Sequence, residues 1–582
     1  MVRRILAATA LVAMAGCTGG EGGGSGLSIE IDGPLSPAYT NGVLTFQIDV
    51  KGGHPERVEL RRDGALLAEV GYPYLFAWDT AADPEGLYTV LAVAIDGEKT
   101  VQSDPVSVTV DRTAPAIVER SPLDGATDVD VYGMVTVLLD EAVDIDTVDL
   151  ARIDFANGTP INGASLSADG KTLTLPAGAD FLPVPNVATV DLTDVRDLAG
   201  NPVDAGNWNF ELPAWLSLGA ADRVPTSDAS EPAIAVDATD HPVVAFLEEA
   251  DLMVSRWNGT AWVALGDELD AVVTNEIAVP CIAVDASDAP IAAWIEWDAT
   301  VVGSPRELRT ARWSGSAWIA MGAALNETAG DASNPVLLGN DGAGAPMIAW
   351  NEGGRVRVSR HLTGAWQPVG AATLPAAASA RGTYLTSGNN VVRLVYRAPD
   401  AAVQVLRLSG STWQAEGAPV SLSGREDLSI TFDNYYFVPV VAVAEEDGNA
   451  DFHLQVRQFD GASTWYDIAF PPTASIAAAN PRLTNAPIGN GGGVFEEGAG
   501  FGEAPPIETY PSLQIVWSEN GDVKASVFDF FEWAPMGAAD YVTEATAAQP
   551  AIAHDGVHGV YLTWHEDDDG ARSVRIGRMN RR

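Results

Sequence analysis

Short runs of alternating hydrophobic and polar residues, separated by turn residues, recur along most of the chain. Val43-Leu44-Thr45-Phe46-Gln47-Ile48 and Val106-Ser107-Val108-Thr109-Val110 are two of them. Successive side chains of a β-strand point to opposite faces, so such runs predict strands with one buried side and one solvated side. Their β-branched, alternating composition does not fit a helical solenoid. The pattern therefore predicts an all-β protein.

The segment 27–112 has several such strands at regular spacing, which is typical of a β-sandwich. Within it, Tyr74-Leu75-Phe76-Ala77-Trp78 followed by Glu85-Gly86-Leu87-Tyr88 resembles bacterial Ig-like domains. Asp111-Arg112-Thr113-Ala114-Pro115 follows the last strand and predicts a linker.

The next segment, 113–213, resembles the Ig-like domain of bacterial surface-layer proteins, which implies a spacer or display module rather than a catalyst. Its acidic stretches could hold calcium, but no closely spaced carboxylate loop of the calcium-binding type occurs, which favours a solvated surface. The resemblance is carried by Ser121-Pro122, Asp140-Glu141-Ala142-Val143-Asp144, Ala168-Asp169-Gly170-Lys171, Asp197-Leu198-Ala199-Gly200-Asn201 and Trp208-Asn209-Phe210.

From residue 214 onward the sequence repeats. Ala214-Trp215-Leu216-Ser217-Leu218-Gly219 recurs at 261–266, 317–322 and 365–370, and looser copies centre on Trp413, Trp465 and Trp533. Successive tryptophans of this set are 47, 56, 48, 47, 52 and 68 residues apart. Each interval carries three further hydrophobic runs, and four short strands at this period predict the blades of a β-propeller.

The tryptophan strands also indicate how the ring closes. The first of them, Trp215–Gly219, precedes any complete unit, whereas the last unit, 551–579, has none of its own. We therefore expect Trp215–Gly219 to pair with Val574-Arg575-Ile576, which would close the ring and leave no free edge. The count predicts a seven-bladed propeller over 214–582, and six or eight blades follow if the degenerate middle repeats are divided differently.

Composition restricts the partners. The chain has 33 Lys+Arg against 79 Asp+Glu, a net charge of −46, so nucleic acid, which is bound through Lys and Arg, is not an expected partner. The two cysteines, Cys17 and Cys281, cannot form a disulfide framework. Cys281 occupies the repeat position that Ala233 has earlier, which favours a small buried side chain over a reactive thiol.

The N-terminus predicts export. Arg3 and Arg4 precede an apolar run that ends in Met14-Ala15-Gly16-Cys17. This ending resembles the lipobox of bacterial lipoproteins, with Met14 where leucine is usual, and implies a signal peptide over 1–17 with a lipid on Cys17. The Gly/Ser-rich stretch 18–26 suits a flexible tether. We expect a lipid-anchored protein of the cell envelope, at the outer membrane or cell surface; an ordinary cleaved signal peptide is the alternative.

A glutamate ends the second strand in six of the seven repeats, whereas the fourth repeat has Ala398 there. Strands of a blade alternate in direction, so these carboxylates would ring one face of the propeller. They could form an acidic rim that binds a cation or a polyhydroxyl ligand. Repetition favours the structural alternative, in which each carboxylate accepts backbone N–H bonds. The set comprises Glu248, Glu296, Glu352, Glu445, Glu519 and Glu566.

Two further repeated features have structural interpretations. Basic residues six positions before a tryptophan are expected to be exposed on the face opposite the glutamates. The turns 257–262 and 313–318 resemble the Asp-box turns of sialidase-like propellers, although the turn aspartate is missing, and in that family these turns are structural. The basic residues are Arg256, Arg312, Arg360 and Arg407.

Catalytic and metal-binding patterns are weak. Arg223-Val224-Pro225 is similar to the Arg-Ile-Pro of sialidase propellers, but an arginine triad, a Tyr/Glu pair and an acid cannot be assembled by spacing. His554 and His558 flank a turn without a third ligand, and Asp567-Asp568-Asp569-Gly570 suits a solvated hairpin tip. No phosphate loop or nucleophile elbow occurs in its proper context. We expect no catalytic residue, no metal and no cofactor, with calcium as the alternative.

The sequence thus predicts a surface lipoprotein whose non-catalytic propeller binds a polysaccharide or protein ligand, or serves in adhesion. Two alternatives stay open: a sialidase-like glycan-active enzyme and a purely structural envelope protein. Because one fold hosts all three, side chains at the mouth of the channel decide between them. A varied set there favours ligand binding, and a plain repetitive set favours a structural role.

Overall fold

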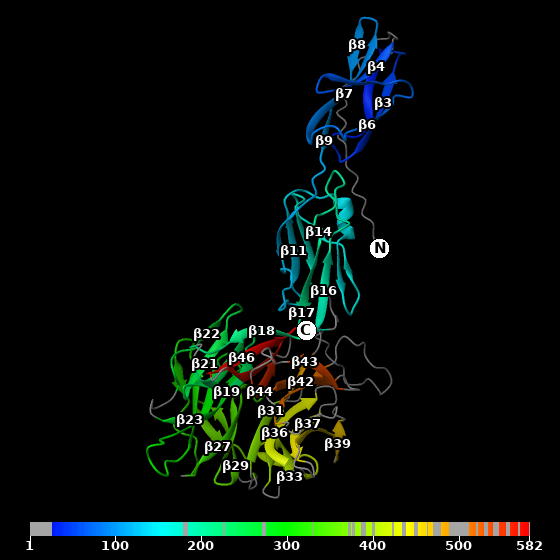
Figure 1. Ribbon diagram of the computed structural model, residues 1–582. Helices are drawn as coiled ribbons and strands as arrows, with labels where there is room; N and C mark the ends of the chain where they lie inside the picture. The colour runs from blue at the N-terminus through cyan, green and yellow to red at the C-terminus, as the bar shows by residue number, and fades with distance from the viewer. Residues whose placement is uncertain are drawn as a thin grey trace, which may run out of the picture.

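The computed structural model describes residues 26–178, 184–224, 227–269, 275–328, 330–370, 374, 379–385, 391–398, 402–421, 424–433, 438–446, 452–462, 464–468, 479–487, 511–519, 522–528, 533–538, 546–554, 559–568 and 571–580. Cys17 and the tether 18–25 lie outside this set. In the described residues the fold is all-β, with one short 3-10 helix, η1 (Ile145–Leu150). No described helix has the length and apolar character needed to span a membrane. Figure 1 shows two small sandwiches and a larger ring in a row.

The first sandwich packs a three-stranded sheet, in the order β1-β3-β6, on a six-stranded one whose main path is β2-β9-β7-β4-β5, with β8 beside β7. The predicted strand 106–110 is confirmed as β9, whose valines are buried while Ser107 and Thr109 are partly exposed. Phe46 and Trp78 fill the core between the sheets. The strands are β1 (Ser28–Gly33), β2 (Ala38–Thr40), β3 (Val43–Lys51), β4 (Arg57–Arg62), β5 (Ala65–Glu69), β6 (Leu75–Asp79), β7 (Gly86–Asp96), β8 (Lys99–Gln102) and β9 (Val106–Val110).

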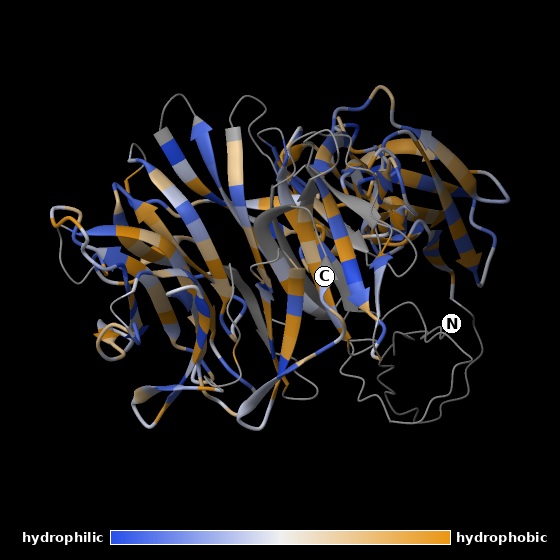
Figure 2. Cartoon of the chain, turned by 90° about the horizontal axis from the view of Figure 1, so that it is seen from below, coloured by the Kyte–Doolittle hydropathy of each residue, from blue (hydrophilic) through white to orange (hydrophobic). Residues whose placement is uncertain are grey.

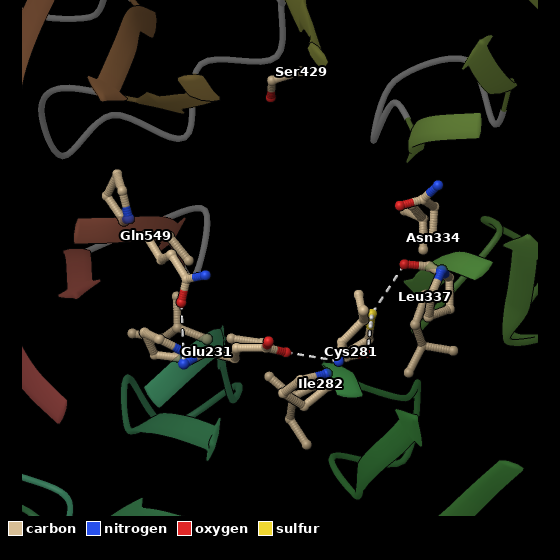
Figure 3. Close-up of a pocket in the computed structure, with 16 residues that line it drawn as sticks. Glu231, Cys281, Ile282, Asn334, Leu337, Ser429 and Gln549 are labelled. Atoms are coloured by element: carbon tan, nitrogen blue, oxygen red, sulfur yellow. Dashed lines mark hydrogen bonds between the residues drawn. The ribbon is translucent and has the colours of Figure 1, made fainter. Parts of the chain in front are cut away.

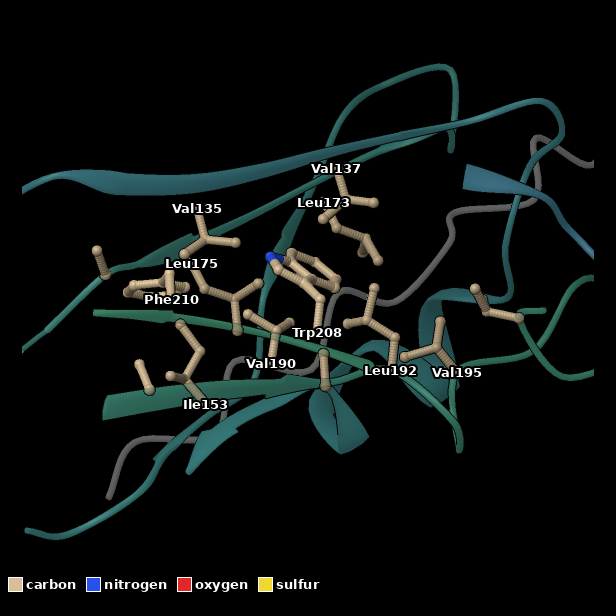
Figure 4. Packing of buried hydrophobic residues seen from close by; sticks show 14 of the residues in the cluster. Val135, Val137, Ile153, Leu173, Leu175, Val190, Leu192, Val195, Trp208 and Phe210 are labelled. Atoms are coloured by element: carbon tan, nitrogen blue, oxygen red, sulfur yellow. The ribbon is translucent and has the colours of Figure 1, made fainter. Parts of the chain in front are cut away.

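The second sandwich consists of two four-stranded sheets, β10-β11-β15-β14 and β13-β12-β16-β17. Strand β17 alternates strictly, so that Trp208, Phe210 and Leu212 are buried. Figure 4 shows Trp208 and Phe210 packed against aliphatic side chains from both sheets. The strands are β10 (Ile117–Ser121), β11 (Met134–Leu139), β12 (Arg152–Phe155), β13 (Ile161–Asn162), β14 (Ser165–Leu166), β15 (Thr172–Pro176), β16 (Asn186–Asp191) and β17 (Asn207–Leu212).

The described residues after Pro213 form seven antiparallel sheets of four main strands each. Hydrophobic and hydrophilic residues alternate along many of these strands (Figure 2), which lets each sheet pack on its neighbours. The first three sheets consist of β19 (Ala229–Val236), β20 (Pro242–Glu248), β21 (Asp251–Trp257), β22 (Trp262–Ala264); β23 (Glu276–Val284), β24 (Pro290–Trp297), β25 (Glu307–Trp313), β26 (Trp318–Ala320); and β27 (Ala332–Leu338), β28 (Met347–Glu352), β29 (Arg355–Leu362), β30 (Ala365–Pro368).

The remaining sheets follow the same order. The fourth carries an additional short strand, β35, beside β33. The strands are β31 (Ser379–Leu385), β32 (Val392–Arg397), β33 (Ala402–Ser409), β34 (Thr412–Ala415), β35 (Val420–Ser421); β36 (Gly424–Asp433), β37 (Val438–Glu446), β38 (Phe452–Phe459), β39 (Trp465–Ile468); β40 (Ala479–Pro487), β41 (Pro511–Glu519), β42 (Asp522–Phe528), β43 (Trp533–Ala538); and β44 (Thr546–His554), β45 (Val560–Asp568), β46 (Ala571–Met579), completed by β18 (Trp215–Ala220).

The sheets are arranged as a closed ring. The first strands of consecutive sheets contact one another in the order β19, β23, β27, β31, β36, β40, β44 and back to β19. The predicted closure is confirmed, because β18 pairs antiparallel with β46. Its partners run from Arg575 to Met579, a few residues beyond the predicted segment 574–576. Trp215 is 1% exposed and packs with Trp564 in the core of this last sheet.

The second sandwich holds both strands of this closure. The Asn580 side chain is buried: its Oδ1 accepts from the N–H of Val131 at 2.9 Å, and its Nδ2 donates to the carbonyls of Val129 and Pro213, each at 2.9 Å. Beside it, Arg578 pairs with Asp130. The sandwich therefore contacts the ring where the two ends of the ring's chain meet.

Candidate functional site

Four of the six predicted glutamates are buried inside the sheets, and Glu519 is partly exposed. Glu248, Glu296, Glu352 and Glu566 are each at most 3% exposed. The Oε1 atom of Glu248 accepts from the backbone N–H groups of Arg223 and Val224, both at 3.0 Å. For Glu445, β37 is described but the side chain lies outside the described residues. Backbone donors of this kind are what the structural alternative requires.

A Trp-x-Glu pattern explains most of these carboxylates, and the sequence analysis missed it. Residues two apart point to the same face of a strand, so the indole N–H reaches the carboxylate. Trp Nε1 donates to Glu296 at 3.0 Å, to Glu352 at 3.1 Å, to Glu519 at 2.7 Å and to Glu566 at 3.0 Å; the donors are Trp294, Trp350, Trp517 and Trp564.

Glu352 shows how completely such a carboxylate is satisfied. Its Oε2 accepts from the Glu327 N–H at 2.9 Å, and its Oε1 accepts from both the N–H and the hydroxyl of Thr328. Burial raises the pKa of Glu352, but these donors together with Trp350 outweigh it and hold the pKa below its usual value. The carboxylate therefore stays ionised inside the protein and closes a turn.

The expectation that the repeated arginines are exposed surface residues is wrong for three of them. Each pairs with an aspartate that follows the first strand of its own sheet, and each is only part-exposed, at 29% to 36% of its side chain. The aspartates are almost completely buried, at 8% or less. The pairs are Arg256–Asp237, Arg312–Asp285 and Arg360–Asp341.

The Asp-box-like turns also have internal roles. Asn258 Oδ1 accepts from the N–H groups of Thr260 and Ala261, at 3.0 and 2.9 Å, in place of the missing aspartate. The tryptophan after the turn donates to the preceding sheet, as in Trp262 Nε1 to the Leu218 carbonyl at 2.9 Å and Trp318 Nε1 to the Leu265 carbonyl at 2.6 Å. These turns therefore join neighbouring sheets.

Arg223 of the sialidase-like triplet lies against β21, where it donates to the Val254 carbonyl at 3.3 Å. Burial lowers the pKa of its guanidinium. It is not among the described residues that line the central cavity. Of the other weak candidates, His558, Asp569 and Gly570 lie outside the described residues.

The central channel contains a cavity of about 410 Å³, and first strands of five sheets line it. Four of these strands carry the same irregularity: a residue with positive φ, then a proline, then a shifted register. Positive φ is costly outside glycine, most of all for a β-branched residue such as Val279, whose φ is 52°. We call these four residues the channel girdle: Glu231, Val279, Asn334 and Gln549.

The channel girdle is joined from sheet to sheet by side chains. Gln549 Oε1 accepts from the Glu231 N–H at 3.2 Å, and Glu231 Oε2 accepts from the Val279 N–H at 2.7 Å. Figure 3 shows these bonds around the open centre, with Asn334 on the neighbouring strand. The backbone is shared, but the side chains differ from one sheet to the next, unlike those of the glutamate and tryptophan sets.

Cys281 also lines this cavity. It is half-buried rather than buried, contrary to the expectation, because its strand faces the channel instead of a sheet interface. The Sγ donates to the Pro335 carbonyl of the next sheet at 3.1 Å. Its repeat equivalent Ala233 lines the same cavity, so the position was correctly predicted as small.

Among the described residues, two acidic groups have the spacing that a metal ion requires. One is Glu30, Asp32 and Asp49 on the first sandwich; the other is Asp111, Glu141 and Asp197 between the two sandwiches. In the second group, burial and the neighbouring carboxylates, first Asp111, raise the pKa of Glu141 to about 7. A shared proton is therefore one way in which this cluster relieves its repulsion.

Comparisons with known proteins bear on the second sandwich. Residues 111–211 match the bacterial Ig-like domain family. The match covers most of the segment that was predicted as the second Ig-like domain. No protein with a curated description matches the chain.

Solved structures resemble the chain only distantly. Hadza microbial sialidase Hz136 is 12% identical over 80% of this chain and 96% of its own, with a TM-score of 0.35. The lectin SapL1, solved with α-methyl fucoside, is 16% identical over 54% and 96%, with a TM-score of 0.35. The six-bladed Aleuria aurantia lectin is 12% identical over 52% and 95%, with a TM-score of 0.31. At these scores the similarities carry no functional argument.

Proposed function

We propose that this chain is a surface lipoprotein in which two Ig-like domains display a non-catalytic, seven-bladed propeller that binds a glycan or protein ligand in its channel. Cys17 would carry the lipid, and 18–26 would be the tether at the outer membrane or cell surface. The propeller would begin at residue 214 and the second Ig-like domain, of the surface-layer type, at 113.

The variation of the channel girdle carries this proposal. Glutamate, valine, asparagine and glutamine occupy one backbone position in four sheets, at a place where the strand is held in a costly conformation. Features that only build a blade repeat their residue type, as the Trp-x-Glu carboxylates and the Asp–Arg pairs do. A structural ring gains nothing from different side chains at equivalent positions, whereas an asymmetric ligand requires them.

The same residues favour binding over hydrolysis. Glycoside hydrolysis in its usual form needs two carboxyl groups flanking the bond. The described lining residues of the channel supply one, that of Glu231. The nearest repeated carboxylate in sequence, Glu248, has its Oε1 occupied by Arg223, Val224 and Ser227.

A screen tests the binding half of the proposal. The whole chain with Cys17→Ser, which remains soluble after export, is applied to a glycan array and a surface-peptide array. We expect a retained partner whose signal falls on Asn334→Ala and not on Asn162→Ala, an exposed asparagine of the second sandwich. An array signal that is unchanged by Asn334→Ala, or turnover of an aryl glycoside or sialoside, would contradict the proposal.

The anchor is tested separately. Cys17→Ser should move the protein from the detergent phase to the aqueous phase in a phase partition of the exported fraction, because the diacylglycerol is lost. Equal retention of the wild type and the variant would refute lipidation.

A further inference from the structure

Each polar side chain of the channel girdle has hydrogen-bonding capacity left over. Gln549 uses its Oε1 on Glu231, which leaves its Nε2 as a donor. Glu231 uses its Oε2 on Val279, which leaves its Oε1 as an acceptor. Asn334 has neither amide atom engaged within the described part of the chain, so it can both donate and accept. The cavity thus presents a donor, an acceptor and a mixed group on three strands.

Most of the rest of the described wall is apolar, although Ser429 of the fifth sheet and Cys281 also line it. Proline rings from four sheets follow the channel girdle, and aliphatic side chains lie beyond them. Among the described residues, the lining has no aromatic anchor of the kind that dominates peptide binding. These apolar residues are Pro232, Pro280, Pro335, Pro550, Ile234, Ile282 and Leu337.

The polar atoms are also held in place. One end of the Gln549 amide and one oxygen of Glu231 are fixed by backbone N–H groups of the next sheet. The remaining Nε2 of Gln549 and Oε1 of Glu231 are therefore restricted in position. The two bonds run in the same direction around the ring, from the seventh sheet to the first and from the first to the second. A ligand therefore meets groups whose orientation is already set before it binds.

We infer that the channel binds an uncharged sugar of one or two rings, an assignment that rests on the proposed function and names its ligand. A sugar hydroxyl donates and accepts at once, which matches all three free groups, and the C–H faces of the ring match proline and aliphatic walls. The cavity of about 410 Å³ lies in the range of small-molecule pockets. The free Glu231 oxygen and the net charge of −46 repel acidic sugars.

Cys281 provides a reporter in the same cavity. In the whole chain with Cys17→Ser it is the one remaining cysteine, and its alkylation by iodoacetamide can be followed by mass spectrometry. We expect at least one of glucose, galactose, fucose and maltose to slow the alkylation in a saturable way. Glucuronate, which differs from glucose by a carboxylate, and tetra-alanine should protect less well.

Variants connect the protection to the channel girdle. Asn334→Ala and Glu231→Gln should each raise the half-protecting sugar concentration about tenfold. Asn334→Ala removes a hydrogen bond to the ligand, and Glu231→Gln exchanges a charge-assisted bond for a weaker neutral one. Glu231→Gln keeps an amide oxygen for the Val279 N–H, so the fold is preserved. Asn162→Ala should leave protection unchanged.

The outcomes separate this inference from the proposed function. Protection by a charged sugar or a peptide alone overturns the uncharged sugar but keeps the channel as a ligand site. If an array partner requires Asn334 but none of the four sugars protects Cys281, the channel is again a ligand site whose ligand is not an uncharged sugar. If Asn334→Ala is protected as well as the wild type, and array binding does not depend on Asn334 either, both the sugar inference and the proposed channel site are wrong.

Discussion

At the scale of single residues, the glutamates that end the second strands act as acceptors for groups in their own surroundings. Glu352 has four donors from three residues, and its exposed fraction is 1%. A buried ionised group of this kind stabilises the fold only while all its donors are matched.

Glu352→Gln should therefore destabilise the protein by about 1–3 kcal/mol at neutral pH, because the amide nitrogen faces donors. The pKa of Glu352 is lowered in the folded state, so its contribution is present above the usual glutamate pKa and is lost as the pH falls through the folded value. Urea titrations at several pH values should show the gap between variant and wild type closing in acid. Glu276→Gln, an exposed glutamate of β23, is the control. If Glu352→Gln kept full stability but no longer bound ligand, the interpretation of these glutamates as a ligand-binding acidic rim would be restored.

Glu141 has the opposite dependence. Its folded pKa of about 7 lies above the usual 4.5, so the folded state holds the proton more tightly and stability falls as the pH rises from about 4.5 to 7. Glu141→Gln should remove this fall and be more stable than wild type at pH 8, with the two alike near pH 4. Amide hydrogen exchange in β15 and β16, measured in EDTA, reports the local stability. Glu119→Gln, a change at an exposed glutamate, should show the same pH dependence of exchange as the wild type. If Glu141→Gln also shows that dependence, Glu141 does not hold the proton.

The sequence revealed which residues repeat but not what they contact. The positions of the glutamates and arginines followed from alignment of the repeats. The partners of Arg256 and Arg312 did not, because Asp237 and Asp285 lie 19 and 27 residues earlier and meet them only once the sheet has formed. The channel girdle was missed because Glu231, Val279 and Gln549 share a backbone conformation and not a residue type.

At the scale of elements, the glycine at the end of some tryptophan strands makes room for the next sheet. A Cβ on Gly370 would lie 2.6 Å from Cδ1 of Trp413, at a φ of +62°. At the same repeat position, Gly219 has φ +76° and nothing within 4 Å of a Cβ. The sequence showed the glycine but not this difference, because the residue type is the same at both positions and only the packing of the neighbouring sheet differs.

Gly370→Ala should thus cost more than Gly219→Ala by about 1–3 kcal/mol, since both substitutions strain a left-handed backbone of similar φ but one alone overpacks a buried tryptophan. Urea denaturation of the two variants beside the wild type measures the difference. Equal losses would show that the indole of Trp413 moves aside without cost and that backbone strain alone fixes this glycine.

At the scale of the whole molecule, the order of two sandwiches and a ring followed from strand spacing, turn composition and the tryptophan period. The contact between the second sandwich and the ring did not, because it joins Asn580 to Val131 and Val129, far apart in sequence and unmarked by any motif. This sandwich is therefore more than a spacer: it holds the first and last strands of the ring next to each other.

Closure by β18 is the feature on which the propeller depends. A fragment that begins at Ala221 lacks the whole strand, exposes the edge of β46 and loses Trp215, a truncation that typically costs about 3–5 kcal/mol for a buried aromatic. We expect it to melt far below a fragment that begins at Pro213 and to associate in analytical ultracentrifugation. Trp215→Ala in the whole chain provides a second measurement that does not depend on the folding of the shorter fragment. It should lower the melting temperature of the ring while the sandwiches unfold as before. Equal melting of both fragments as monomers, with a silent Trp215→Ala, would mean that the ring is held closed by the contacts of its inner strands and does not need its fourth strand on the last sheet.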